Sequence, residues 1–277
     1  MSRRKNAYRI KLFQDEARIA TVGDNCLDVY EKQGMVFTGG NPVNVAVYIV
    51  RLGGKASYTG VVGDDEYGRI VIEALRGKGV DTNHVRVEYG STAVTKVELV
   101  NGERVFGEYD EGVLANFKLT DGDIDFLCSH DMVVSGIWGH IEDDLWKIQA
   151  RSVPVLFDFS NQPEHPVVQK AISHVDYAFF ASDDGDTPQL RAFMKDMQSR
   201  GPRCVVVTLG AEGSIAYDGK KFCTFGIVPC KVVDTMGAGD SYIAGFIYGL
   251  MHNKAIAECM RMGAENSSVT LTYQGAW

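Results

Sequence analysis

The sequence predicts an α/β fold in which a central, mostly parallel sheet is flanked by helices, with a few extra strands at one side. The main observation is a series of near-continuous apolar runs separated by helical segments, as in strands buried on both faces of a parallel sheet. A chain of 277 residues with 45% hydrophobic and 23% charged residues is long enough for one large domain with a substantial core. The apolar runs are residues 132–137, 155–160, 177–182 and 204–210.

Composition and charge exclude several classes of protein. The net charge of −8 argues against nucleic-acid binding, which usually shows a basic balance, and no apolar run has the length of a membrane span. The six cysteines form no C-x-x-C pair, so we expect reduced thiols in a cytoplasmic protein. Residues 1–17 are basic without the apolar core of a secretory signal, and we read them as an N-terminal extension.

The first strand is predicted over Arg18–Gly23, followed at once by polar residues. Asp24, Asn25 and Asp28 come at the carboxyl end of this strand. Ligands of open α/β sheets gather at such ends. Asp28 is therefore a candidate ligand-binding residue, although, taken alone, a turn residue is the better explanation.

A glycine pair and a helix come next. Gly39-Gly40 permits close backbone approach, Asn41 is a suitable N-cap, and Pro42 suits the first helical position. An apolar stripe follows and Gly53 ends the helix. Capping explains Asn41 well but leaves Asn44, within the first turn, without a structural reason.

The middle of the first half differs in character from the βα pattern around it. A strand over Ser57–Gly63 and a helix to about Gly79 continue the α/β pattern. Residues 91–109 instead alternate between apolar and polar on both sides of Asn101-Gly102, the strongest hairpin signal in the chain. We expect these strands to form an insertion beside the main sheet.

A glycine-rich turn joins the apolar pair Val232-Val233, expected to end a strand, to a helix. Gly237, Ala238 and Gly239 place several backbone N–H groups at a helix N-terminus, which favours an anion. Asp240 follows in the first turn, where it could accept a proton from a hydroxyl or could be only a cap. No G-x-x-x-x-G-K-[ST] occurs, and the turn lacks the third glycine of a dinucleotide-binding loop.

Three stretches resemble the signatures of the ribokinase/PfkB family of carbohydrate kinases. D-T-M-G-A-G-D is similar to that family's D-T-x-G-A-G-D, G-G-N-P-V-N-V-A to its G-G-N-x-x-N-x-A, and T-L-G-A-E-G to its T-L-G-x-x-G nucleotide loop. The resemblance covers residues 18–277 and implies a ribokinase-like fold. It also implies lid strands at about residues 29–39 and 91–111, which often form a homodimer contact.

The resemblance implies ATP-dependent phosphorylation of a primary hydroxyl on a sugar or sugar amine. In this family the last Asp of the signature is the catalytic base and the Gly-Ala-Gly backbone is the anion hole, which here are Asp240 and residues 237–239. The substrate-binding residues implied are Asp28, Gly39, Gly40, Asn44 and, near Trp138 in the distinctive I-W-G-H, His140. The nucleotide-binding residues implied are Thr208, Gly210, Gly213 and Asn266.

One departure concerns the metal. The family often carries N-x-x-E to organise Mg²⁺ through water, but Ser182 and Gly185 stand at those two positions, so we name no metal ligand. A monovalent-cation requirement stays open.

Two alternative functions remain beside this sugar kinase: a kinase for another sugar or a nucleoside, and a sugar sensor without catalysis. Neither nucleic acid nor membrane is expected as a partner. The acidic run at 108–111 would suit a cationic sugar amine, or is simply a solvated face.

Overall fold

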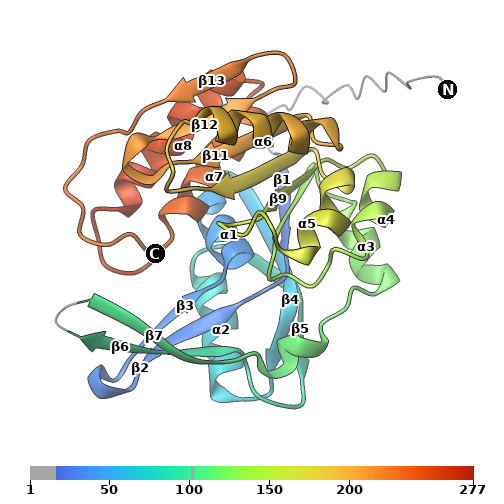
Figure 1. Cartoon of the computed structure of the whole chain (residues 1–277). Helices are drawn as coiled ribbons and strands as arrows, with labels where there is room; N and C mark the ends of the chain where they lie inside the picture. Colours follow the sequence, from blue (N-terminus) through green and yellow to red (C-terminus); the bar gives the residue numbers. More distant parts are fainter. Residues whose placement is uncertain (1–16, 101–102) are drawn as a thin grey trace.

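The computed structural model describes residues 17–100 and 103–277, which form two sheets of unequal size (Figure 1). The strands of the large sheet are β1 (Arg18–Val22), β4 (Lys55–Gly63), β5 (Asp81–Glu88), β8 (Met132–Gly136), β9 (Val155–Asp158), β10 (Tyr177–Ala181), β11 (Cys204–Thr208), β12 (Ser214–Tyr217) and β13 (Phe222–Phe225). The small sheet has β2 (Cys26–Tyr30), β3 (Met35–Gly39), β6 (Val94–Val100) and β7 (Glu103–Asp110). The helices are α1 (Asn41–Arg51), α2 (Glu66–Gly77), α3 (Asp121–Leu127), α4 (Leu145–Ala150), α5 (Pro166–Ala171), α6 (Pro188–Ser199), α7 (Ala238–Met251) and α8 (Ile256–Thr270).

The large sheet is mostly parallel, as predicted. Its strand order is β13-β12-β11-β10-β9-β8-β1-β4-β5, and pairing is parallel from β11 to β5. Only the β11–β12 and β12–β13 pairs are antiparallel, at one edge. Both neighbours of β1 follow it in the chain: β4 and then β5 extend the sheet on one side, and β8 to β13 extend it on the other. This topological switch point is where open α/β sheets bind ligands.

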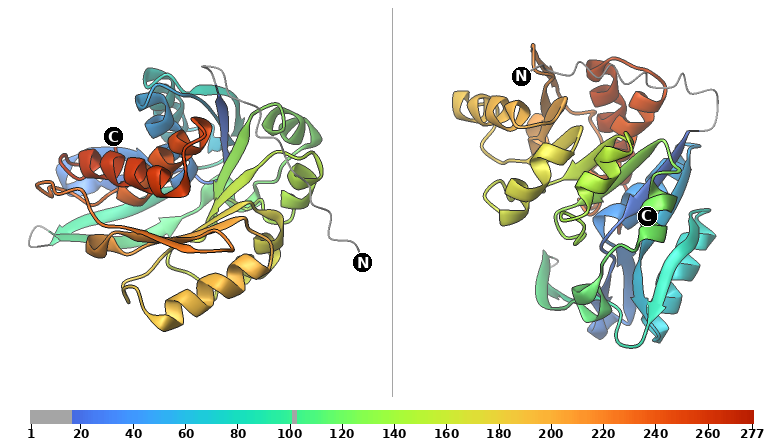
Figure 2. Two further views of the ribbon diagram at one scale, coloured as in Figure 1. Left: turned by 90° about the horizontal axis from the view of Figure 1, so that it is seen from above. Right: turned by 90° about the vertical axis from the view of Figure 1, so that its right-hand side faces the viewer.

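Helices cover both faces of the large sheet (Figure 2). Successive side chains of a strand point to opposite faces, so Phe179 packs in the core beneath α1, α7 and α8, whereas Phe180 packs in the core beneath α3 to α6. Both side chains are almost fully buried. The near-continuous apolar runs seen in the sequence follow from this burial on both sides.

The small sheet has the order β3-β2-β6-β7 and contains the segments predicted as lid strands. Strand β2 begins at Cys26, so Asp28 lies inside a strand and not in a turn. Strands β6 and β7 pair antiparallel, as a hairpin requires. The predicted turn at Asn101-Gly102, like residues 1–16 of the predicted extension, lies outside the described residues.

Two local predictions are wrong. The apolar pair Val232-Val233 does not end a strand: the chain between β13 and α7 has no regular structure, and both side chains are more than half exposed. The Val233 N–H instead donates to the carbonyl of Leu271, at 2.7 Å. Asn41 is not the N-cap of α1, because Gly40 takes that position and Asn41 is the first helical residue.

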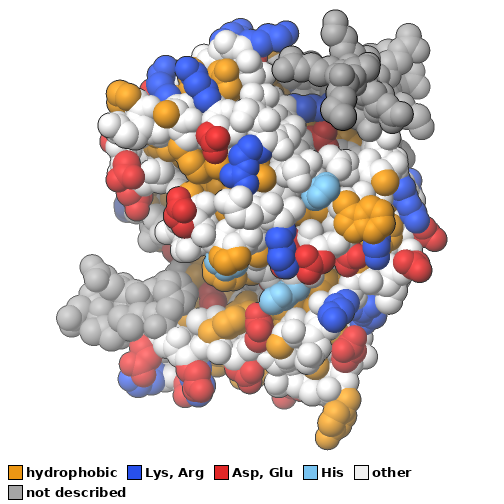
Figure 3. Space-filling model, turned by 45° about the vertical axis from the view of Figure 1, so that its right-hand side comes forward, with side chains coloured by type: hydrophobic (Ala, Val, Ile, Leu, Met, Phe, Trp, Pro, Cys, Tyr) orange, Lys and Arg blue, Asp and Glu red, His pale blue; other side chains and the backbone are white. Residues whose placement is uncertain are grey.

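The surface charges, the cysteines and the helix lengths can be compared with the predictions from composition. On the face shown in Figure 3, acidic and basic side chains are interspersed. All six cysteines are free thiols, as predicted. None of the helices in the described part of the chain is long and apolar enough to cross a membrane.

Candidate active site

The predicted catalytic turn lies at the N-terminus of α7, next to the carboxyl ends of β1 and β9. Gly237 is the N-cap residue of α7 and adopts φ +70°, which favours glycine. A Cβ at this position would also collide with the hydroxyl of Tyr48. The turn therefore needs glycine. The Ala238 N–H donates to the Thr235 carbonyl at 3.2 Å, and the helix N-terminus that follows the turn favours an anion through its dipole.

Asp240 is held by two asparagines from the first turn of α1. Asn41 donates from Nδ2 to Asp240 Oδ1 at 2.7 Å, and Asn44 donates from Nδ2 to Asp240 Oδ2, also at 2.7 Å. Desolvation raises the pKa of Asp240 and the two amide hydrogen bonds lower it, and the balance places the pKa at about 6. A carboxylate that is fixed in orientation and poised just below neutral pH suits a general base.

Asp240 belongs to a cluster of three carboxylates. The Asn41 amide also donates to Asp158 Oδ2 at 2.9 Å, and the Asn41 backbone N–H donates to Asp24 Oδ2 at 3.2 Å. Burial and the charge of Asp240 raise the pKa of Asp158 to about 7 and that of Asp24 to about 6. The other oxygen of Asp24, Oδ1, is buried without a hydrogen-bond partner among the described residues.

This cluster predicts opposite pH dependences of stability and activity. The pKa values of Asp24, Asp158 and Asp240 are about 6 to 7 in the folded protein, above the usual 3.8. The folded state therefore binds more protons than the unfolded state between about pH 4 and 7. The free energy of unfolding decreases as the pH rises through this range. A base must be ionised, so kcat/KM rises over part of the same range. Urea unfolding at pH 5 and pH 8 measures the first effect. We expect Asp158→Asn to reduce the pH-dependent loss by roughly 2–4 kcal/mol.

The control for this measurement is Asp196→Asn, because the Asp196 side chain is 64% exposed. Its unfolding free energy should follow that of the wild type at every pH. Parallel curves for Asp158→Asn and the wild type would show that Asp158 is ionised at its ordinary pKa in the folded protein.

The structure brings two predicted sugar-binding residues to the carboxylate cluster, Asn44 beside Asp240 and Gly40 beside Asp24. Gly40 has φ +110°, and a Cβ there would meet the Asn25 Cα and the Asp24 carbonyl at 2.9 Å each. Asn44 contacts Asp240 directly. Both lie at the start of α1, at the topological switch point.

The other predicted sugar-binding residues come from the small sheet and the loop after β8. Asp28 lies in β2, opposite Phe37 of β3, and Gly39 ends β3. His140 follows β8, and its Nε2 lies 2.9 Å from Oε1 of Glu111, the residue just after β7. This contact joins the large sheet to the small one at the rim of the site.

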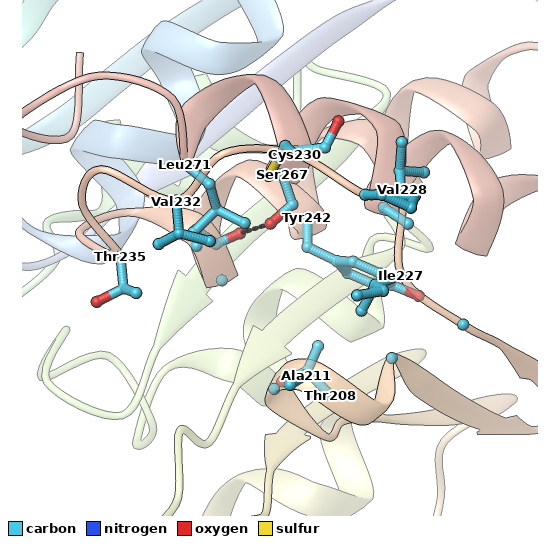
Figure 4. Close-up of a pocket in the computed structure, with 18 residues that line it drawn as sticks. Thr208, Ala211, Ile227, Val228, Cys230, Val232, Thr235, Tyr242, Ser267 and Leu271 are labelled. Atoms are coloured by element: carbon cyan, nitrogen blue, oxygen red, sulfur yellow. Dashed lines mark hydrogen bonds between the residues drawn. The ribbon is translucent and has the colours of Figure 1, made fainter.

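A cavity of about 490 Å³ lies beside the glycine turn, and Figure 4 shows the residues that line it. Three predicted nucleotide-binding residues, Thr208, Gly210 and Gly213, line it. Ala238 and Gly239 line it too, so the cavity reaches the turn that carries Asp240. Its wall is mainly apolar, as suits a flat heterocycle. The remaining lining residues are Ala211, Gly226, Ile227, Val228, Pro229, Cys230, Val232, Thr235, Tyr242, Ala264, Ser267, Ser268 and Leu271.

Asn266 does not line this cavity. Its side chain is buried, donates from Nδ2 to the Ser241 carbonyl at 2.7 Å, and accepts from Arg51 Nη2 at 2.9 Å. The amide thus fastens α8 to α7 and α1. Its neighbours Ser267 and Ser268 line the cavity in its place, so helix α8 borders the cavity as expected but Asn266 faces away from it.

The stretch that departs from N-x-x-E has a carboxylate beside it from another element. Gly185 has φ +71°, and a Cβ there would meet Oε2 of Glu212 at 2.7 Å. Glu212 ends the short 3₁₀ helix Gly210–Glu212, in the loop that also carries Thr208 and Gly213. The carboxylate therefore comes from the predicted nucleotide loop.

Sequence reasoning missed the roles of Asn41, Asp158 and Trp277. Asn41 was assigned a capping role, yet its amide joins two carboxylates. The sequence signal for Asp158 is its position as a charged residue within an apolar run. Trp277 donates from Nε1 to Asn44 Oδ1 at 2.8 Å, a contact across more than 230 residues that no local pattern reveals.

Comparison with known proteins shows the family of the chain. The model of the pfkB family carbohydrate kinases matches residues 10–277. The chain is 44% identical to the fructoselysine 6-kinase of Shigella flexneri over 94% of this chain and 99% of that protein. It is 32% identical to a fructosamine kinase of Bacillus subtilis, over 94% and 93%. The ribokinase of Arabidopsis thaliana, solved with ribose and ATP, superposes with a TM-score of 0.83 at 23% identity, covering 95% of this chain and 94% of that one. The chain belongs to the pfkB family of carbohydrate kinases.

Proposed function

We propose that this protein transfers the γ-phosphoryl group of ATP to the C6 hydroxyl of fructoselysine or a related fructosamine. The observation that carries the proposal is the place of Asp240. Its carboxylate is oriented by Asn41 and Asn44. Asp240 directly follows Gly239, which lines a cavity that can take a nucleotide. The similarity to fructoselysine and fructosamine kinases supports the substrate.

The chemistry assigned to the site is simple. The sugar hydroxyl oxygen bonds to the γ-phosphorus as the bond from that phosphorus to the bridging oxygen breaks, and Asp240 takes the hydroxyl proton. The N–H groups of Gly237, Ala238 and Gly239 stabilise the charge on the transferring group. Phosphoryl transfer depends mostly on positioning and electrostatics, which one base and a backbone cradle supply.

We propose Mg²⁺ as the cofactor that accompanies ATP. No group of three His, Cys, Asp or Glu residues within 17–100 and 103–277 is arranged to hold a metal ion. Mg²⁺ needs few protein ligands, because it keeps several waters and is often held mainly by substrate phosphates. We propose that Glu212 contacts waters bound to that ion. It would replace the Glu of N-x-x-E, whose position Gly185 occupies. When bound, the ion would offset phosphate charge.

The sugar would lie between the glycine turn and the small sheet. We assign its hydroxyls to Asp28, Asn44 and the backbone of Gly39-Gly40, and the small sheet to a lid that excludes water. A fructosamine carries a cationic amine and a charged tail. The pair Glu111–His140 lies at the junction of the two sheets, where the Glu111 carboxylate could meet the amine and the His140 ring could form a hydrogen bond to the tail.

Two further assignments rest on the family alone. We propose that the protein forms a homodimer through its small sheet and acts in the cytoplasm. Size-exclusion chromatography with light scattering tests the dimer. A monomer at micromolar concentration would contradict it.

The test of function is ATP consumption by the purified protein with Mg²⁺. The substrates are fructoselysine, fructose, ribose and a nucleoside, and NMR reads the position of the new phosphate. We expect the highest kcat/KM with fructoselysine, phosphorylated at C6. Preference for ribose or the nucleoside would replace the proposed substrate. Sugar binding without turnover on any of them would instead indicate a sensor.

A further inference from the structure

The side chain of Asn44 is engaged at both ends of its amide. Its Nδ2 donates to Asp240 Oδ2 at 2.7 Å, and its Oδ1 accepts from Trp277 Nε1 at 2.8 Å. An indole N–H is only a donor, so it fixes which end of the amide is the oxygen. The donor end of Asn44 must then face Asp240.

The backbone next to Trp277 is anchored from two directions. The Ala276 carbonyl accepts a hydrogen bond from the Tyr48 hydroxyl of α1 and a second, at 3.0 Å, from the Tyr273 hydroxyl. The ammonium of Lys78 lies 5.5 Å from the centre of the indole ring. The indole is therefore held in place independently of its bond to Asn44.

The same segment is tied to the glycine turn through Asp234. The Gly275 N–H donates to Asp234 Oδ2 at 2.7 Å, and the Met236 N–H donates to Asp234 Oδ1 at 3.0 Å. Met236 precedes Gly237, the first residue of the turn. The segment that positions Trp277 is thus fixed relative to the backbone that leads to Asp240.

We propose that Trp277 is a positioning residue for Asp240 that acts through Asn44. Without the indole N–H, Asn44 Oδ1 has lost its donor, and the amide is free to rotate. Rotation would remove a donor from Asp240 or turn an oxygen toward its carboxylate. This inference rests on the proposed role of Asp240 as the base.

Several charged or titratable groups influence the Asp240 carboxylate. Asp24 after β1 and Asp158 at the end of β9 are linked to it by charge, and Tyr48 of α1 lies close enough for Asp240 to raise the pKa of its hydroxyl. The hydrogen bond from Asn44 is the first of the contacts that lower the pKa of Asp240. Losing that bond should therefore raise the pKa of Asp240.

The test is the pH profile of kcat/KM for Trp277→Phe, which removes the N–H but keeps an aromatic ring. We expect the acid midpoint to rise by about one pH unit, so that kcat/KM falls about 2-fold at pH 7 and about 10-fold at pH 5. The KM for ATP should not change, because Trp277 does not line the nucleotide cavity. A closer replacement is β-(benzothienyl)alanine at position 277, in which sulfur replaces the N–H, so a folding defect of the Phe variant does not block the test.

A double-mutant cycle separates this role from a general structural one. In an Asn44→Ala background, Trp277→Phe should cause no further change, since its effect passes through Asn44. Trp146→Phe is the control, because Trp146 is 54% exposed, and it should keep the wild-type profile. An unshifted acid midpoint, or an equal loss in both backgrounds, would overturn the inference. Full activity of Asp240→Asn would instead exclude Asp240 as the base, and no turnover of the wild type with any sugar would overturn the proposed function.

Discussion

Asp240→Asn should lower kcat by about 10²–10⁴-fold, the usual contribution of a positioned base. The amide cannot take the hydroxyl proton, and it would place an N–H group against Asn41 or Asn44, each of which donates to Asp240 in the wild type. ATP binding should persist, because Asp240 does not line the nucleotide cavity. Steady-state kinetics and titration calorimetry with ATP measure the two quantities separately.

The matched control is Asp196→Asn, the same chemical change at an exposed position of α6. It should leave both kcat and ATP affinity unchanged. Near-normal turnover of Asp240→Asn with the same sugar would exclude this carboxylate as the base. Loss of ATP binding together with turnover would mean that the substitution disturbed the turn itself.

The second large effect concerns the anchoring of α7. Phe246 is fully buried, and its ring lies 5.1 Å from that of Phe179 on β10, at an interplanar angle of 83°. We expect Phe246→Ala to reduce the free energy of unfolding by about 3–5 kcal/mol, through lost burial and the cavity left behind. Urea unfolding at one fixed pH measures it. Since α7 begins at the turn that carries Asp240, the proposed base, kcat should fall as well.

Trp146→Ala is the control for the loss of an aromatic ring, because Trp146 is half exposed in α4. Its unfolding free energy should stay within about 0.5 kcal/mol of the wild type. A loss below about 1 kcal/mol for Phe246→Ala would show that the helix repacks around the gap.

Sequence patterns predicted the large sheet because its physical cause is local. Strands such as β10 are apolar along their whole length since both faces are covered, and that property is visible in five consecutive residues. The short strands β12 and β13 gave no such signal. Val232-Val233 gave a false one, because two exposed valines read the same as the end of a buried strand.

The glycine turn and its aspartate were predictable because a short motif holds them. The surroundings of Asp240 were not, because Asn41, Asp158 and Trp277 lie far from one another in sequence and meet only when the sheet is formed. Asn266 shows the limit of transferring a role by family: the helix borders the cavity as expected, yet the side chain faces Arg51.

The irregular segment between β13 and α7 has a thermodynamic consequence. Its side chains Ile227 and Val232 line the cavity while remaining more than half exposed. A ligand that covers them removes apolar surface from water, and this gives binding a negative heat-capacity change. The enthalpy of nucleotide binding should therefore become more favourable on warming, a calorimetric signature that phosphate contacts alone would not produce.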